Sequence, residues 1–302
     1  MELVKPGINV NFVGRLKYAV AFSIILTFIC VVSILWKGLY YGIDFAGGTL
    51  VQIKFHQKTS ADDIRKVLNE IGIDDSVIQP FGSDQVVVRT VKSSSDVKGL
   101  SSKIEGSLNA AYGKDAFQVQ RVEVVGPKIG KDLTKKALLA VIFSWIGMLV
   151  YIAFRFDFRY AVGGIVGVIH DVIVVVGIFS IFNIEFTLTI VAALLTIIGY
   201  SIHDTIVLFD RVRENVRKDS KKDLGTIMNE SINQTLSRTI LTSLTVVIVV
   251  AVLYFFGGAV IHDFAFALLV GVIFGTYSSV FIASPVVLVW ENIRPSTSKR
   301  KK

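Results

Sequence analysis

The sequence predicts a polytopic α-helical membrane protein with six transmembrane helices and one external α+β domain. Apolar residues make up 52% of the 302 residues and charged residues only 19%, against about 25% in typical soluble proteins. Six stretches with little or no charge reach the roughly 20 residues that a bilayer requires. Between the first two stretches lies a polar segment of about a hundred residues, which is long enough to form its own core.

The six apolar stretches contain no Lys or Arg. They comprise residues 18–36, 137–154, 160–182, 186–209, 239–261 and 264–290. The first is predicted to be transmembrane helix 1, and helices 2 to 6 are placed within 135–290. The first stretch is too long for the apolar core of a signal peptide and is not followed by a cleavage site, so we expect an uncleaved anchor.

The basic residues of the short connections predict the orientation. Seventeen Lys and Arg lie in segments 1–17, 155–159, 210–238 and 291–302, whereas the opposite connections 183–185 and 262–263 contain none. Because basic connections stay in the cytoplasm, both termini are predicted to be cytoplasmic and residues 37–134 external. The net charge of +8 lies mostly in these connections, which argues against nucleic-acid binding.

Strand and helix signals alternate through the external segment 37–134. Strands are predicted at 49–55, 77–81, 85–91 and 117–125, and helices at 60–72 and 96–112. Ser60 is a typical helix N-cap, and Gly82, Ser83 and Asp84 form a hairpin turn signal. The order βαββαβ predicts a ferredoxin-like domain.

The cytoplasmic connection 210–238 is predicted to contain an amphipathic helix. Its apolar residues recur at helical spacing: Leu224, Ile227, Met228, Ile232 and Leu236. Such a helix can lie at the inner membrane interface or pack on the bundle, and the pattern favours neither. The last segment, 291–302, is a basic tail.

Two carboxyl groups inside the apolar stretches are the candidate functional groups. Asp171 lies near the middle of the third stretch, and Asp204 lies nearer the cytoplasmic end of the fourth. A charged Asp at mid-membrane costs about 2.5–3.5 kcal/mol, so it needs a partner, water or a proton. Each follows a histidine, His170 or His203, but adjacent helix residues point about 100° apart, so we expect no His–Asp contact within a helix. Contacts between the third and fourth stretches are expected instead.

A proton-linked role is favoured over hydrogen bonding that only fixes helix packing, because two ionisable pairs on consecutive stretches exceed what packing needs. Two His and two Asp could bind a metal, but no supporting motif is present, and we expect no metal or cofactor. No nucleophile motif is found, so no enzyme activity is predicted. Arg238, at the cytoplasmic start of the fifth stretch, can reach either lipid phosphates or a carboxylate.

A glycine-rich run, GIDFAGG, joins the first apolar stretch to the first strand. It precedes a strand instead of opening a helix, and no Gly-Lys-Ser/Thr follows, which argues against a phosphate-binding loop. We expect a tight turn that needs positive φ. Its motif residues are Gly42, Ile43, Asp44, Phe45, Gly47 and Gly48.

These motifs resemble those of the SecF members of the SecD/SecF translocase family. The resemblance rests on GIDFAGG at 42–48 and on GYSIHDTIVLFDRVREN at 199–215, with further matches at QTLSRT (234–239) and at His170-Asp171. It covers essentially the whole chain. One departure is His203, where the family more often has Asn.

The resemblance implies half of an RND-type transporter, completed to twelve helices by SecD. It implies an accessory subunit in the bacterial inner membrane that uses the proton motive force to promote export of unfolded polypeptides, with SecYEG and YajC as further partners. Asp204 matches the family's proton-pathway Asp, and Arg238 matches its cytoplasmic-end Arg. The alternative is half of a proton-driven RND exporter of small molecules or lipids, which would normally be one long chain with larger external domains.

Overall fold

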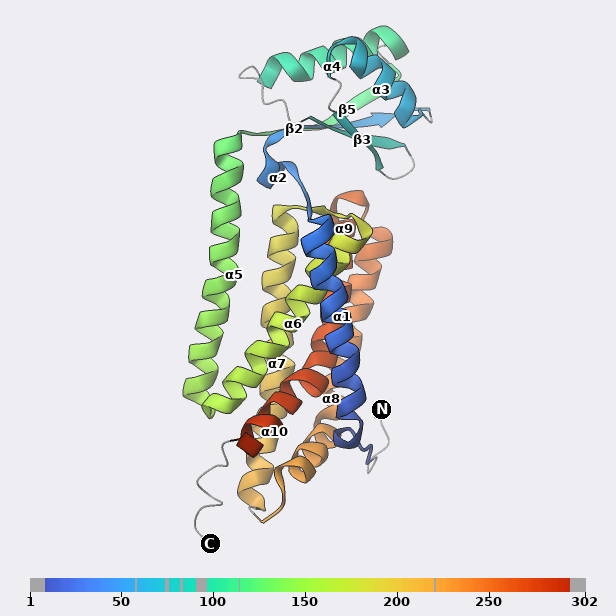
Figure 1. Cartoon of the computed structure of the whole chain (residues 1–302). Coiled ribbons are helices and arrows are strands. Elements are labelled where there is room, and N and C mark those ends of the chain that lie inside the picture. Colours follow the sequence, from blue (N-terminus) through green and yellow to red (C-terminus); the bar gives the residue numbers. More distant parts are fainter. Residues whose placement is uncertain are drawn as a thin grey trace.

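The computed structural model describes residues 9–57, 59–73, 76–81, 84–90, 97–113, 115–219 and 221–293. Among these residues, six helical segments are long and apolar enough to cross a membrane. Figure 1 shows that the six segments form one bundle, with a small α+β domain at one end and both ends of the chain at the other. The chain is therefore a multi-pass membrane protein with the predicted architecture.

Three of the six spanning segments form the centre of the bundle. The spans are α1 (Leu16–Lys37), α5 (Pro127–Arg155), α6 (Phe158–Phe182), α7 (Leu188–Lys218), α8 (Leu224–Phe256) and a sixth that begins with α9 (Ala259–Ser278). About half of the most apolar part of α6, α7 and the sixth span is buried, whereas α1, α5 and α8 leave most of theirs exposed. The bundle core therefore lies on α6, α7 and α9.

The helices extend beyond the apolar stretches that predict them. α5 begins at Pro127, so residues 127–134, which the sequence assigns to the external domain, are helical. Proline is favourable at the first helical position because its missing N–H needs no partner there. The predicted amphipathic helix is the first part of α8, and its residues Ile227, Met228 and Ile232 are buried. Packing on the bundle is therefore favoured over the membrane interface.

The sixth span is interrupted, although the sequence predicts one continuous helix. A π-helical turn, η2 (Ser279–Ala283), separates α9 from α10 (Ser284–Ile293). Pro285 explains the interruption, because a proline lacks an N–H and its ring clashes with the carbonyl four residues earlier, here that of Phe281. The π turn accommodates the missing hydrogen bond.

The α+β domain has the predicted ferredoxin-like arrangement. Its elements are β2 (Gly48–Phe55), α3 (Ala61–Glu70), β3 (Ser76–Phe81), β4 (Gln85–Thr90), α4 (Val97–Tyr112) and β5 (Phe117–Val125). The antiparallel sheet has the order β3-β4-β2-β5, and both helices cover the face away from the bundle (Figure 1). Ser60 caps α3 as predicted, by accepting a hydrogen bond from the Asp62 N–H. Of the predicted hairpin turn, Gly82 and Ser83 lie outside the described residues.

The glycine-rich run forms the junction between domain and bundle. It contains the single-turn helix α2 (Ile43–Ala46), where the sequence predicts only a turn, and the expected positive φ occurs at Gly47 (75°) and Gly48 (132°). Gly42 has φ −70°, so its backbone conformation does not require glycine. A larger residue would not fit there, because a Cβ would lie 2.7 Å from Glu185 Oε1. A Cβ at Gly130 of α5 would lie 2.7 Å from the Phe45 carbonyl oxygen.

A buried ion pair crosses this junction. β1 (Tyr40–Tyr41) pairs in parallel with β6 (Glu185–Phe186), two strands too short for the sequence pattern to predict. Arg89 of β4 forms an ion pair with Glu185 and donates a hydrogen bond to the Tyr40 hydroxyl at 3.1 Å. Burial raises the pKa of Glu185 to about 7; Arg89 opposes this rise, and Asp263 and Asp44 add to it.

The raised pKa makes the junction sensitive to pH. Because the folded-state pKa of Glu185 lies above the ordinary Glu value, its contribution to stability is fully present below about pH 4.5 and is lost as the pH rises through about 7. The loss of folding stability is at most about 3 kcal/mol.

We expect the Tm of Glu185→Gln, which cannot ionise at this position, to rise relative to that of the wild type as the pH increases from about 4.5 to about 7. Thermal unfolding of the detergent-purified protein measures this, with Glu105→Gln, on exposed α4, as the control. A Tm difference that does not change with pH would contradict the assignment.

Candidate functional site

Two carboxyl groups are buried within the helix bundle. Asp171 of α6 is 1% exposed, and Asp204 of α7 is 5% exposed. Both are candidates from the sequence, and they lie on adjacent, packed helices. Their hydrogen-bond partners differ, and this difference determines what each group can do.

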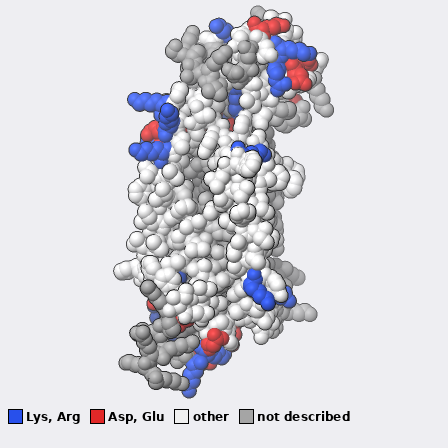
Figure 2. All heavy atoms as spheres, in the orientation of Figure 1, with Lys and Arg blue, Asp and Glu red and all other residues white. Residues whose placement is uncertain are grey.

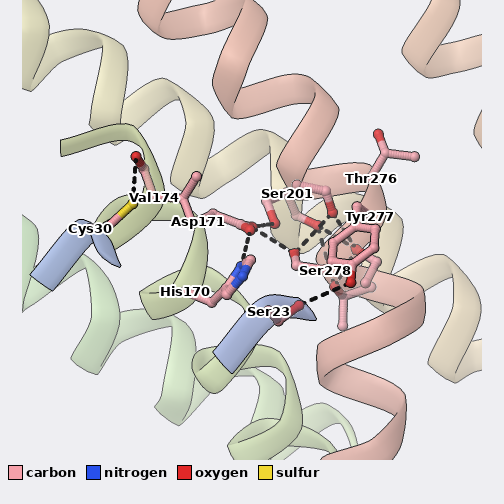
Figure 3. A network of polar contacts seen from close by, with 12 residues as sticks. Ser23, Cys30, His170, Asp171, Val174, Ser201, Thr276, Tyr277 and Ser278 are labelled. Atoms are coloured by element: carbon pink, nitrogen blue, oxygen red, sulfur yellow. Dashed lines mark hydrogen bonds and ion pairs between the residues drawn. The ribbon is translucent and has the colours of Figure 1, made fainter. Parts of the chain in front are cut away.

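Asp171 forms hydrogen bonds with three side chains (Figure 3). The Ser201 hydroxyl of α7 donates to Oδ2 at 2.6 Å, and the Ser278 hydroxyl at the end of α9 donates to the same oxygen at 2.7 Å. The third partner is His170 Nδ1, which lies 3.1 Å from Oδ1, and the position of the proton decides which of these two atoms donates. The contact between Asp171 and Ser201 confirms that the third and fourth spans meet through polar groups.

The His170–Asp171 contact corrects the expectation that no such pair forms within a helix. Consecutive Cα–Cβ bonds do point about 100° apart. Nδ1, however, is only two bonds from the imidazole Cβ, so the ring can turn back toward the next carboxylate. Both side chains are buried away from water, and the hydrogen bond gives each of them a partner, although His170 Nε2 is buried without one among the described residues.

Both oxygens of the Asp171 carboxyl group have hydrogen-bond partners: two serine hydroxyls donate to Oδ2, and His170 Nδ1 contacts Oδ1. Since these partners come from α6, α7 and α9, the Asp171 carboxyl group joins the three central helices. We call Asp171 with His170, Ser201 and Ser278 the Asp171 cluster.

Asp204 has far weaker support. Among the described residues, its one side-chain hydrogen bond, 3.4 Å from Ser243 Oγ of α8, is long for an O–H···O bond. Ser243 Oγ is only 2.7 Å from Thr276 Oγ1, whose own hydroxyl donates to the Val272 carbonyl. The single hydroxyl hydrogen of Ser243 therefore has two acceptors to choose between, and Thr276 is the closer. Asp204 has at most this one weak donor, which suits a protonated acid.

A small cavity borders Asp204. Thr235, Leu236 and Thr239 of α8 line it, together with Ser279 of η2. It has room for about one water molecule, and its hydroxyl groups can serve as hydrogen-bond partners for that water. Asp204 is therefore a buried acid next to a small, mainly apolar cavity that has a few hydroxyl groups in its lining, on the side of α8.

Arg238 and His203 do not contact Asp204 directly. Arg238 lies on α8 between the cavity-lining Thr235 and Thr239, but its side chain is exposed and forms no ion pair with any described residue. His203 is exposed, and the described residues show no hydrogen bond between it and Asp204, as expected for adjacent residues. Within the described part of the chain, no three His, Cys, Asp or Glu side chains are grouped as metal ligands would be.

Sequence reasoning missed the hydroxyl partners of both carboxylates. Ser201, Ser243, Thr276 and Ser278 all lie inside apolar stretches. A small polar residue in such a stretch usually faces another helix, and this signal could have found them. The sequence could not show which carboxylate each hydroxyl reaches, because this depends on how the helices cross.

Comparisons with known proteins match the whole chain. The family model described as "Protein export membrane protein SecD/SecF, C-terminal" matches residues 104–293, and the "SecD/SecF GG Motif" model matches residues 32–59. The protein translocase subunit SecF of Magnetococcus marinus is 43% identical over 295 residues, covering 96% of this chain and 95% of that protein. SecF of Pseudomonas aeruginosa is 42% identical over 290 residues, covering 96% and 94%.

Two solved structures share the fold. The crystal structure of SecDF, a translocon-associated membrane protein from Thermus thermophilus, superposes with a TM-score of 0.87 at 38% identity. SecDF in its super-membrane-facing form gives a TM-score of 0.73 at 37% identity. The alignments cover 97% and 100% of this chain but only 40% and 41% of the SecDF chains, so this chain spans less than half of SecDF.

Removing a hydrogen-bond donor from the Asp171 cluster should lower the stability of the protein. Ser278→Ala removes one hydroxyl from a buried carboxylate, and we expect it to destabilise the protein by about 1.5–3 kcal/mol. Thr196→Val is the control, because the Thr196 hydroxyl bonds only to its own helix and is exposed. The measurement is Tm of the detergent-purified variants. Equal Tm values for the two variants would show that the hydrogen bonds to Asp171 contribute nothing to stability.

Proposed function

The chain belongs to the SecD/SecF family of protein export membrane proteins, and we propose that it is a SecF-type accessory subunit of the Sec translocase. In this role it pairs with SecD and uses the proton motive force to promote export of unfolded polypeptides through SecYEG, with YajC as a further partner. It acts as a transport component and not as an enzyme. The near full-length match to SecF proteins and the similarity to SecDF structures support an association with SecD.

We assign the chain to the bacterial cytoplasmic membrane, with both termini inside and the ferredoxin-like domain outside. The seventeen-to-none distribution of Lys and Arg in the short connections supports this orientation. Figure 2 shows the matching surface, with Lys and Arg gathered toward the two ends and a broad belt of uncharged residues between them.

The contrast between the two buried carboxylates carries the proton-linked part of the proposal. Three short hydrogen bonds tie the Asp171 carboxyl group to α6, α7 and α9, so a change of its protonation state would disturb contacts between three helices. Asp204 has only the long contact with Ser243 among the described residues and borders a water-sized cavity that is lined in part by hydroxyl groups. We therefore assign proton binding and release to Asp204, and structural support of that site to Asp171 and His170.

Proton release from Asp204 is the step that couples the proton motive force to export. A neutral acid is stable in the buried site, whereas a carboxylate there needs water or a counter-charge. Arg238, on the same helix as the cavity-lining threonines, is the cation nearest in sequence to that cavity, and His203 lies on the exposed side of α7. We assign both to the cytoplasmic exit. Moving one charge through the membrane potential provides about 2.3 kcal/mol per 100 mV.

Asp204→Asn tests the assignment. We expect the variant to insert and to assemble with SecD but to lose the ionophore-sensitive increment of export, because Asn keeps the shape of Asp and cannot release a proton. The measurement is export of a secreted protein into energised vesicles, with and without a proton ionophore, at matched levels of the complex.

Two comparisons sharpen this test. Asp219→Asn removes the same charge outside the bundle and should keep the full increment. Asp171→Asn should lower Tm more than it lowers the increment per assembled complex. An Asp204→Asn variant with a full increment would leave Asp204 as a packing residue.

The orientation has its own test. A single reporter cysteine at exposed Ser102 of α4 should react with an impermeant thiol reagent added outside intact cells, and one at exposed Lys221 should not. The native Cys30 is buried and does not compete. Labelling of Lys221→Cys but not of Ser102→Cys would reverse the proposed orientation.

A further inference from the structure

A basic cleft opens at the end of the bundle that lies far from the α+β domain. It lies between the C-terminal end of α5 and the last turns of α7, and its volume is about 360 Å³. Its lining residues are all charged: Arg155, Asp210, Arg213, Glu214, Arg217 and Lys218. The five residues from α7 follow the spacing i, i+3, i+4, i+7 and i+8, which places them on one helix face.

The acidic residues of the cleft are already neutralised. Glu214 forms ion pairs with Lys218 at 2.6 Å and with Arg211, outside the cleft, at 2.5 Å. Asp210 lies 3.7 Å from Arg155. The cleft therefore keeps an excess of positive charge.

Arg213 and Arg217 supply this excess. Arg213 donates a hydrogen bond to the Arg155 carbonyl at 3.2 Å, at the C-terminus of α5, and pairs with no carboxylate among the described residues. Arg217 is exposed and has no ion pair within the described chain. Two guanidinium groups one helical turn apart, each free of a carboxylate, can bind one phosphate with paired N–H donors.

The position of the cleft selects a lipid as the source of that phosphate. It lies where the apolar stretches of α5 and α7 end and charged residues begin. Next to it on α5, Tyr151 is 60% exposed and Phe154 is 96% exposed. These side chains offer acyl chains an apolar contact surface directly beside the charged cleft, whereas a soluble phosphate would gain nothing from them.

We propose that this cleft is a binding site for an anionic phospholipid, with the headgroup phosphate on Arg213 and Arg217 and the acyl chains along Tyr151 and Phe154. Basic pockets between membrane helices are known to suit such headgroups. A lipid bound there bridges α5, which is otherwise the most exposed span, to the end of α7. The proposal does not depend on the role of Asp204.

The test uses the full-length protein in nanodiscs of zwitterionic phosphatidylcholine, with fluorescent phosphatidylglycerol as the probe. We expect Arg217→Gln to weaken phosphatidylglycerol binding about tenfold, and Arg213→Gln/Arg217→Gln to weaken it further. Lys221→Gln/Lys222→Gln removes two cations from the same end but outside the cleft, so it controls for general charge attraction and should bind like the wild type. The Arg217 side chain forms no ion pair within the described chain, so Arg217→Gln should leave the fold intact. This single variant keeps the test valid even if the double variant misfolds.

Competition separates a lipid from a soluble anion. Excess glycerol phosphate or inorganic phosphate should fail to displace the probe, whereas unlabelled phosphatidylglycerol should displace it. Displacement by inorganic phosphate at equal concentration would overturn the lipid assignment. Equal probe affinity in Arg217→Gln, the double arginine variant and the double lysine control would overturn the site itself.

Discussion

The arrangement of the central helices depends on the burial of the Asp171 carboxylate. An aspartate carboxyl group at mid-membrane is costly unless its oxygens have hydrogen-bond partners, and here these partners come from three helices. Ser201 of α7 and Ser278 of α9 complete the set that His170 begins on α6. The requirement therefore fixes how the three helices rotate and how closely they approach. Glycines make that approach possible: a Cβ on Gly271 would lie 2.3 Å from the Ile197 side chain.

In the proposed function, Asp204 is the carboxyl group that changes its protonation state, because it has weaker hydrogen-bond support than Asp171. The two residues look equivalent in the sequence, since each is an Asp that follows a His in an apolar stretch. Hydroxyl hydrogens distinguish them, because Ser201 and Ser278 direct theirs at Asp171 while the Ser243 hydroxyl lies closer to Thr276 than to Asp204. A membrane carboxylate with a full set of donors stabilises structure, whereas one without them is suited to exchange a proton with water.

The sequence predicts the six spans and the ferredoxin-like domain because both follow from periodicity, which is a local property. It places the strand 117–125 correctly, and it cannot foresee β1 and β6, which are two residues long and exist only because the domain sits on the bundle. Pro285 indicates the interruption at η2, but it lies within an otherwise apolar stretch that predicts a continuous helix. The partners of Asp171 and Asp204 were not predictable, because helix crossing angles are set by tertiary packing.

One helix carries the three features that matter most. The N-terminal N–H of α7, at Leu188, is bound by Asp44 of the glycine-rich junction, two residues after the strand that holds Glu185. Its middle bears Ser201 and Asp204, and its last turns bear Arg213 and Arg217 of the basic cleft. A straight helix transmits displacement along its axis better than a chain of loops does. If Asp204 binds and releases a proton as we propose, a shift of α7 would act directly on the junction beneath the ferredoxin-like domain, and this helix would link proton binding inside the membrane to movement of that domain.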